Sequence, residues 1–238
     1  MTALLFLVTL GTVSAAGLDV TGDNPDWVGV SFWLATAMML ASTVFFIMER
    51  NNVAAKWKTS MTVAALVTGI AWYHYTYMRD HWNTTGESPL VLRYVDWLIT
   101  VPLQVSEFYL ILAAIGVASA ALFWRLFGAS LVMLIAGFLS ESADSIDAIT
   151  SSMEWPLFIV GVLAWAYIIY ELWAGEAKEK VSGASEGTQF AFKAMAIILT
   201  VGWAIYPLGW ILGQDAGKTG IENLNILYNI ADVVNKTA

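Results

Sequence analysis

Long apolar runs separated by short polar links dominate the sequence. Seven runs are long enough to cross a bilayer, at residues 28–48, 57–78, 89–114, 117–140, 154–174, 189–212 and 221–238. Apolar runs of this length are typical of transmembrane helices. Because the links between them are short, the helices must pack together as one bundle. The pattern therefore predicts an all-α membrane protein with seven transmembrane helices.

Prolines mark positions where individual helices should start or bend. Pro89 and Pro156 fall at expected helix starts, where the missing N–H group costs little. Pro102 and Pro207 lie inside their runs, so we expect each to kink its helix.

Composition narrows the class of protein further. Hydrophobic residues make up 58% of the 238 residues and charged residues only 13%, which excludes a disordered chain and exceeds the apolar share of a soluble domain. There is no cysteine, which excludes disulfides and cysteine-ligated metal sites, and we expect no metal. The net charge of −8 argues against nucleic acid as a partner.

The first sixteen residues are typical of a secretory signal peptide. Residues 1–16 have a short apolar core and end in small residues, although a positively charged start is missing. An uncleaved apolar N-terminus is the alternative interpretation. In either case residues 17–238 form the seven-helix domain.

Charges in the links predict the orientation of the bundle. Basic residues follow the first run and the fifth run, namely Arg50, Lys56, Lys58, Lys178 and Lys180. The opposite side carries an acidic loop with Glu141, Asp144, Asp147 and Glu154. Since basic residues stay in the cytoplasm, we expect the N-terminus outside and the C-terminus in the cytoplasm.

The third run carries charged residues at membrane depth. A charge at the centre of a membrane helix costs roughly 2.5–3.5 kcal/mol on insertion scales and usually marks a functional site. Asp96, Gln104 and Glu107 fall on one side of a helix, and the two carboxylates lie about 16 Å apart along it. This arrangement indicates a route for protons. A structural ion pair between Arg93 and Asp96 is the simpler alternative for those two residues.

Glu107 has no basic residue one turn away on its own helix. A lone carboxyl group in an apolar segment favours its protonated form, which suits a proton donor. Thr100, one turn after Asp96, could hydrogen-bond a carboxylate without adding charge.

The last run combines a lysine and an acid on one helix face. Asp232 and Lys236 are four residues apart. A desolvated lysine is suited to Schiff-base chemistry, and Asp96 and Asp232 could supply the counter-ion of a protonated Schiff base. The alternative is a lysine that extends to the lipid headgroups from the end of its helix.

The residues quoted so far occur in a longer pattern. RYVDW at 93–97, EFYLIL at 107–112, GWAIYP at 202–207 and the terminal YNIADVVNK make the sequence similar to the proteorhodopsins, the proton-pumping microbial rhodopsins of marine bacteria. The resemblance runs from about Val28 to Lys236. It implies a seven-helix bundle with a central pocket for all-trans retinal.

The resemblance also assigns roles to residues. Lys236 would carry retinal as a protonated Schiff base, Asp96 would be the proton acceptor and counter-ion, Asp232 the second counter-ion and Glu107 the cytoplasmic proton donor. Asp96, Thr100 and Glu107 reproduce the motif of a proton pump. Arg93 would modulate proton exit, and His74 would hydrogen-bond the acceptor. The chain ends two residues after Lys236, so we expect a seventh helix truncated after this lysine.

Other implied roles concern colour, the pocket walls and assembly. Gln104 matches the colour-tuning site, where glutamine accompanies blue absorption. The aromatic walls of the pocket would include Trp97, Trp203, Tyr206, Pro207 and Tyr228. Trp33 matches a tryptophan that reaches His74 of a neighbouring protomer, which implies a homo-oligomer, a pentamer or hexamer.

These observations predict a light-driven outward proton pump in the inner membrane of a bacterium, with protons and the lipid bilayer as its partners, and not an enzyme. A blue-light photosensor with the same chromophore is the alternative. A membrane protein without retinal is a third possibility if the early end of the chain prevents chromophore binding.

Overall fold

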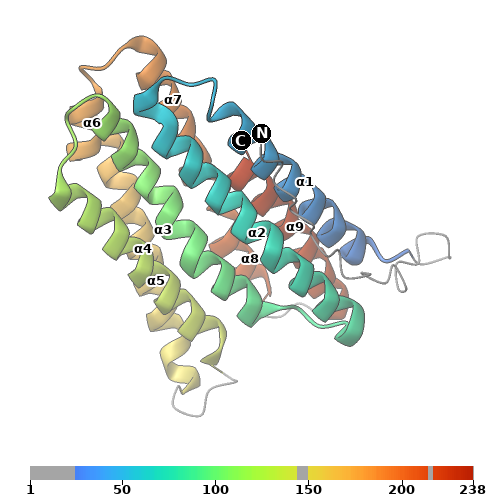
Figure 1. Cartoon of the computed structure of the whole chain (residues 1–238). Helices are drawn as coiled ribbons and strands as arrows, with labels where there is room; N and C mark the ends of the chain where they lie inside the picture. The colour runs from blue at the N-terminus through green and yellow to red at the C-terminus, as the bar shows by residue number, and fades with distance from the viewer. Residues whose placement is uncertain (1–24, 144–149, 214–216, 238) are drawn as a thin grey trace.

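The structure is a computed structural model that describes residues 25–143, 150–213 and 217–237. Within these ranges every regular element is a helix (Figure 1). The proposed signal peptide at residues 1–16 lies outside them, as do Asp144 and Asp147 of the acidic loop.

Seven membrane-length helical passes follow one another along the described chain. They are α1 (Trp27–Glu49), α2 (Lys58–Thr85), α3 (Leu90–Ala114), α4 (Ala120–Glu141), α5 (Glu154–Trp173), the pair α7 (Glu186–Ile197) and α8 (Ile205–Gly213), and α9 (Lys218–Thr237). Short elements lie between them: η1 (Ala55–Trp57), η3 (Ser151–Met153) and α6 (Glu176–Val181). The prediction of a seven-helix bundle is confirmed.

Five helical stretches are long and apolar enough to cross a membrane by length and composition. They are Trp27–Glu49, Leu90–Ala114, Ala120–Glu141, Ser151–Val181 and Glu186–Gly213. The other two passes, α2 and α9, contain more polar residues, several of which are buried inside the bundle. The hydropathy of α2 and α9 is therefore lower because several of their polar side chains face other helices.

Local capping residues set several helix ends. The Asp26 carboxylate accepts a hydrogen bond from the Gly29 N–H at 2.8 Å at the start of α1, and Ser119 does the same for Leu122 at the start of α4. Gly86 ends α2 in the left-handed region, with φ 69°, and its N–H donates to the Trp82 carbonyl.

The second helix is longer than the apolar pattern predicted. The expected run stops at residue 78, whereas α2 continues to Thr85. Its last turns are held by Trp82, which is buried and whose indole N–H donates to the Asp26 carboxylate at 3.1 Å. A tertiary contact thus extends the helix beyond its apolar stretch.

The sixth pass is interrupted. A wide π-helical segment, η4 (Ile198–Gly202), follows α7, and a turn at 203–204 precedes α8. A kink was expected from Pro207, and the interruption lies three to nine residues before the proline itself. Pro207 cannot donate a hydrogen bond to the carbonyl one turn before it, which is that of Trp203. Pro102, by contrast, lies within an unbroken α3.

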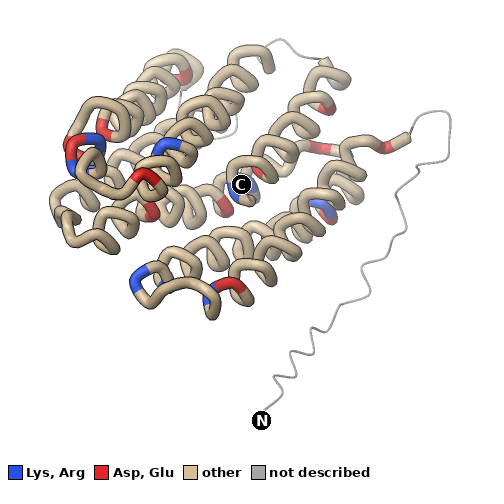
Figure 2. Tube along the Cα trace, turned by 90° about the horizontal axis from the view of Figure 1, so that it is seen from above, with Lys and Arg blue, Asp and Glu red and all other residues tan. Residues whose placement is uncertain are grey.

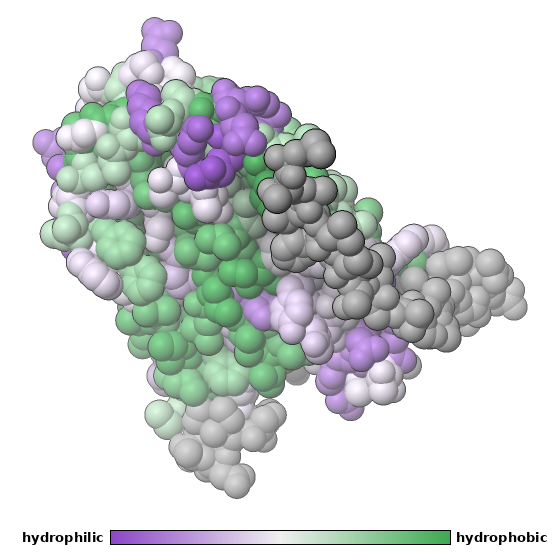
Figure 3. All heavy atoms as spheres, viewed as in Figure 1, coloured by the Kyte–Doolittle hydropathy of each residue, from purple (hydrophilic) through white to green (hydrophobic). Residues whose placement is uncertain are grey.

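The passes form a closed ring. Each of α1 to α5 packs against the next, α5 contacts α7, α8 contacts α9, and α9 returns to α1 (Figure 1). The larger core cluster lies between α3, α4, α5 and α7, and a smaller one joins α1 and α2. Exposed apolar side chains cover much of the outside, and Figure 3 shows this green band between more hydrophilic ends.

The two ends of the bundle carry different charged residues. The α1–α2 connection with Lys56 and the short helix α6 with Lys178 and Lys180 lie at one end, which we call the basic end (Figure 1). Glu141 and Glu154 lie at the other. Seen from above, charged residues are few along the helices and collect in small groups (Figure 2).

Candidate functional site

A lysine and two aspartates form the centre of the site. Lys236 Nζ lies 2.6 Å from Asp232 Oδ2 and 3.1 Å from Asp96 Oδ2. Asp232 and Lys236 are brought together by their i, i+4 spacing on α9, and Asp96 reaches them from α3. Asp96 and Asp232 are at most 1% exposed and Lys236 is 7% exposed. Buried charges of this kind persist only when they are paired, and here they are.

The two aspartates have different hydrogen-bond partners. Asp232 accepts from Tyr75 Oη at 2.8 Å, from Trp97 Nε1 at 3.3 Å and from the Tyr206 hydroxyl. His74 Nδ1 lies 3.1 Å from Asp96 Oδ1, whereas Asp96 Oδ2 makes no hydrogen bond within the described chain. Asp232 is therefore held from three helices besides its own, and Asp96 keeps one oxygen without a hydrogen bond beside the lysine.

Arg93 does not pair with Asp96, so the alternative of a structural ion pair between them is wrong. Its guanidinium, 1% exposed, donates to the side-chain oxygens of Asn225 at 3.0 Å and Asn229 at 2.7 Å. It also donates to Tyr75 Oη at 3.5 Å. Through Tyr75, Arg93 is connected to Asp232.

Thr100 also differs from expectation. Its hydroxyl donates to the backbone carbonyl of Asp96 at 2.9 Å and not to a carboxylate. A threonine in a helix often bonds to the carbonyl four residues earlier, because that acceptor is always within reach.

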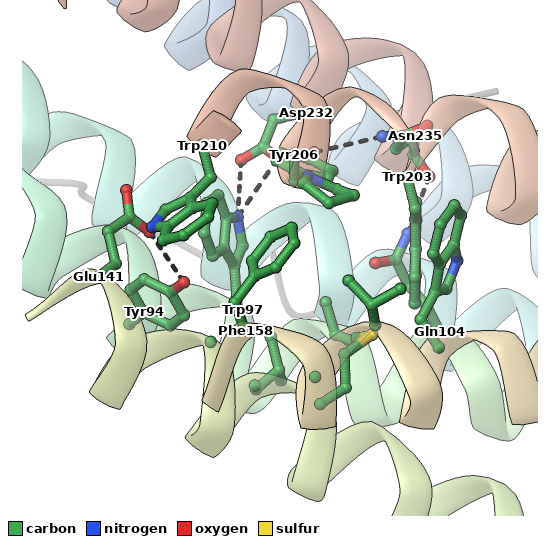
Figure 4. A pocket seen from close by; sticks show the side chains of 18 of the residues that line it. Tyr94, Trp97, Gln104, Glu141, Phe158, Trp203, Tyr206, Trp210, Asp232 and Asn235 are labelled. Carbon is green, nitrogen blue, oxygen red and sulfur yellow. Dashed lines mark hydrogen bonds between the residues drawn. The ribbon is translucent and has the colours of Figure 1, made fainter. Parts of the chain in front are cut away.

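A cavity of about 120 Å³ adjoins the lysine, and we call it the Lys236 cavity. Trp97, Gln104, Trp203, Tyr206 and Pro207, five of the residues that the resemblance assigned to the retinal pocket, line it. Figure 4 shows Gln104 and Trp203 toward one end of it and Tyr94 with Glu141 toward the other. The Gln104 side-chain amide donates to the Asn235 carbonyl at 2.8 Å, which ties α3 to α9 beside the lysine.

Tyr228 does not line the Lys236 cavity. Its ring packs behind those of Tyr206 and Trp97, with centroids 5.6 and 6.4 Å away, and its hydroxyl donates to the Tyr206 carbonyl at 3.3 Å. The prediction of a wall residue is corrected to one that supports the wall from outside.

Sequence reasoning missed several residues of the cavity. Tyr94, Glu141 and Trp210 line it, and the Tyr94 hydroxyl donates to Glu141 Oε2 at 2.9 Å. Glu141 was assigned to the acidic loop but is the last residue of α4. The signal was the spacing of Met133, Gly137 and Glu141, which places all three on one helix face. Further lining residues are Val101, Leu134, Phe158, Gly161, Val162, Trp165 and Asn235.

Glu107 lies apart from this cluster, eleven residues after Asp96 on α3 and toward the basic end. Its Oε1 is buried and makes no hydrogen bond with the described residues. A carboxyl group in such surroundings is stabilised only poorly as an anion.

Two positions proposed for contact between protomers are accessible. Trp33 on α1 is 56% exposed, and the side chain of His74 on α2 is 15% exposed.

Comparison with known proteins places the chain in a family. The family model described as bacteriorhodopsin-like protein matches residues 26–238. The chain belongs to the bacteriorhodopsin-like family. It is 52% identical to the green-light absorbing proteorhodopsin of Gamma-proteobacterium EBAC31A08, over 97% of this chain and 89% of the relative. It is 53% identical to the blue-light absorbing proteorhodopsin of Gamma-proteobacterium Hot 75m4, over 96% and 88%.

Solved structures of the same family have the same fold. A blue light-absorbing proteorhodopsin from Med12 aligns with a TM-score of 0.72 and 52% identity, covering 89% of this chain and 93% of the other. Xanthorhodopsin, described as a light-driven ion pump with dual chromophore, aligns with a TM-score of 0.78 and 28% identity, covering 88% and 87%. The resemblance seen in the sequence is thereby confirmed.

Proposed function

We propose that the chain is a light-driven outward proton pump that holds all-trans retinal on Lys236, and not an enzyme. The observation that carries the proposal is the Lys236 amine, which lies between two buried aspartates at the wall of an aromatic cavity. Relatives named as light-absorbing proteorhodopsins and a neighbour named as a light-driven ion pump support it.

The residues present fit retinal. The Lys236 cavity joins a buried amine to walls of tryptophan and tyrosine rings, which suit an apolar conjugated molecule. Retinal, bound to the Lys236 nitrogen as a protonated Schiff base, would supply light absorption and an isomerisation that reorients the N–H bond. Trp97, Trp203 and Tyr206 would hold it, and Asp232 and Asp96 would balance the positive charge on the nitrogen.

Asp96 is suited to accept the proton from the Lys236 nitrogen. Its Oδ2 lies 3.1 Å from Nζ and has no hydrogen bond, so a lone pair is free to take a proton. Asp232 receives three hydrogen bonds from aromatic side chains, which stabilise its charged form. The difference supports an acceptor role for Asp96 and a fixed counter-ion role for Asp232.

Glu107 is suited to return a proton to the nitrogen from the basic end. It lies on the same helix as Asp96, about three turns away, and its carboxyl group is poorly solvated. We expect Glu107→Gln to slow reprotonation about 100-fold and to leave the absorption maximum nearly unchanged, since general acids contribute at least this factor. Time-resolved absorption measures both. An unchanged rate would contradict the assignment.

The direction of transport follows from the charges at the two ends. If the basic end faces the cytoplasm, Glu107 lies on the cytoplasmic side and Asp96 nearer the exterior. Protons then move outward, past Arg93 and its asparagine partners. We accordingly propose that the chain lies in the inner membrane of a bacterium, with its N-terminus outside and its C-terminus in the cytoplasm.

Gln104 supports blue absorption because its amide lies at the cavity wall near the lysine. A polar group there favours the ground state, in which the charge stays near the nitrogen. Blue- and green-absorbing relatives are almost equally similar to this chain, so the proposal depends on Gln104 itself. Gln104→Leu should move the absorption maximum to longer wavelength.

The exposed ring of Trp33 and the partly exposed His74 support a homo-oligomer, a pentamer or hexamer, in which Trp33 approaches His74 of a neighbouring protomer. Trp33→Ala should reduce the mass of the assembly in native mass spectrometry. Trp124→Ala, at another exposed tryptophan, on α4, serves as the control.

The decisive experiment records external pH while cells that express the chain with retinal are illuminated with blue light. A pump acidifies the medium, a protonophore abolishes the signal, and Asp96→Asn stops it and shifts the colour. Acidification that persists in Asp96→Asn would disprove the acceptor role. A visible band without acidification would favour the photosensor, and no visible band would exclude retinal binding altogether.

A further inference from the structure

A second groove lies at the basic end, on elements that the proposed proton route does not use. It has a volume of about 250 Å³ and is formed by the end of α5, by α6 and by α7. We call it the α5–α7 groove. Figure 1 shows α6 and α7 together at this end of the bundle.

The groove has an apolar floor and an aromatic rim. Leu172, Val181, Phe192 and Ala196 are buried and form the floor. Two aromatic rings stand at the rim, Trp173 and Phe190, and Phe190 is 74% exposed. The Trp173 indole N–H donates to Thr200 Oγ1 at 2.9 Å, which fixes the ring against the sixth pass. Aromatic rings of this kind are enriched where acyl chains meet headgroups.

The charged part of the lining is entirely basic. Lys178 and Lys193 line the groove, and none of the described residues that line it is acidic. Within the described chain neither lysine forms an ion pair. The neighbouring Glu176 is already bound by Arg125 at 2.5 Å and by Lys180 at 3.4 Å.

Lys193 lies at a depth where a free cation is costly. It is seven residues into α7, about 10 Å along the helix from its start. A lysine there lays its apolar stem along the helix surface and directs its amine to the headgroup region. The negative surface of the cytoplasmic leaflet attracts such groups by about 1 kcal/mol each.

We propose that the α5–α7 groove binds one anionic phospholipid of the cytoplasmic leaflet. Lys178 and Lys193 bind its phosphate, and the upper part of an acyl chain lies on the floor beside Phe190 and Trp173. A soluble anion would use the two lysines but leave the floor and the rim in contact with water. The combination of two unpaired cations with an adjoining apolar floor therefore fits a lipid better.

Native mass spectrometry of the full chain tests the proposal, with phosphatidylglycerol and phosphatidylcholine of identical acyl chains added separately. We expect one phosphatidylglycerol to be retained, with roughly thirtyfold higher affinity than phosphatidylcholine, as expected for two lysines. The double variant Lys178→Gln, Lys193→Gln should remove this preference. Lys58→Gln, at the basic end but outside the groove, should keep it. The groove lysines are exposed, so their replacement leaves the core intact, which circular dichroism verifies.

A second pair of variants separates the groove from general surface attraction. Phe190→Ser should weaken binding of both lipids, whereas Phe45→Ser, an exposed phenylalanine on α1, should not. Equal affinity of the wild type for the two lipids would overturn the proposal. So would displacement of phosphatidylglycerol by millimolar inorganic phosphate, which would indicate a site for soluble anions. If Phe190→Ser changed the mass of the oligomer but left lipid retention unchanged, the groove would instead be a contact between copies of the chain, and the proposal would be wrong.

Discussion

The two aspartates beside Lys236 differ through their neighbours and not through their chemistry. Asp232 receives hydrogen bonds from Tyr75, Trp97 and Tyr206, and Asp96 faces His74. Hydrogen bonds to charged groups contribute about 1.5–3 kcal/mol each, more than bonds between neutral groups. The charge of Asp232 therefore receives more hydrogen bonds from neighbouring side chains than that of Asp96 does.

Two tyrosines offer a matched test of this difference. Tyr206→Phe removes a donor from a buried carboxylate and should lower the free energy of unfolding by about 2 kcal/mol. Tyr228→Phe removes a bond to a backbone carbonyl and should cost about 1 kcal/mol or less. Unfolding in a detergent titration measures both. Equal losses would show that the Tyr206 bond has no special strength.

At this scale the sequence predicted the titratable groups better than their partners. Lys236, Asp232 and Asp96 stand out because charge is rare in apolar runs. Tyr75 does not stand out, because its contact with Asp232 joins residues 157 positions apart. Thr100 was assigned to the wrong acceptor, since its own helix supplies a nearer one.

Close approach of two elements supports the rear of the site. A Cβ atom added at Gly209 in α8 would lie 2.6 Å from the Tyr228 ring on α9. The same ring contacts Tyr206 and Trp97, and its centroid is 5.7 Å from the Arg93 guanidinium carbon. The absence of a side chain at Gly209 thus lets α8 and α9 press the aromatic residues together.

Gly209→Ala should accordingly destabilise the protein by about 1–3 kcal/mol, because the added methyl group overpacks the contact. Gly128→Ala on α4 is the control, since nothing lies within 4 Å of its added Cβ. The control should be neutral or should stabilise its helix by up to about 1 kcal/mol. Thermal unfolding measures the stability of both variants. If Gly209→Ala were as stable as the wild type, the close contact at Gly209 would be refuted.

Most helix boundaries agree with the ends of the membrane-length apolar runs in the sequence. Others depart from these ends where tertiary contacts decide, as at Trp82, whose bond to Asp26 accompanies about two further turns of α2. The interruption of the sixth pass was expected from Pro207, but its place depends on the preceding turn, which no single residue reveals.

The whole molecule is a closed ring of passes with opposite charge at its ends, and this determines its expected orientation. Both basic connections lie at one end because an even number of passes separates them. The sequence predicted this arrangement fully, since it needs only helix count and loop charge. The cavity inside the ring was less predictable, because residues such as Glu141 enter it only once the helices are packed.

Cysteine labelling tests the orientation directly, because the chain contains no cysteine of its own. Lys56→Cys and Glu87→Cys introduce single thiols at exposed positions at opposite ends. In intact cells a membrane-impermeant maleimide should label Glu87→Cys and should reach Lys56→Cys only after lysis. The reverse pattern would mean that protons move inward by the same residues.

The wide π-helical segment Ile198–Gly202 determines how α8 is rotated about its axis relative to α7. Such a segment holds one residue more than regular helical turns would. Deleting that residue would rotate α8 by about 100° relative to α7. Tyr206 and Trp210 would then turn away from the Lys236 cavity while α7 kept its packing. The extra residue thus orients the aromatic side chains of α8 toward the Lys236 cavity, and it does so without changing how α7 packs.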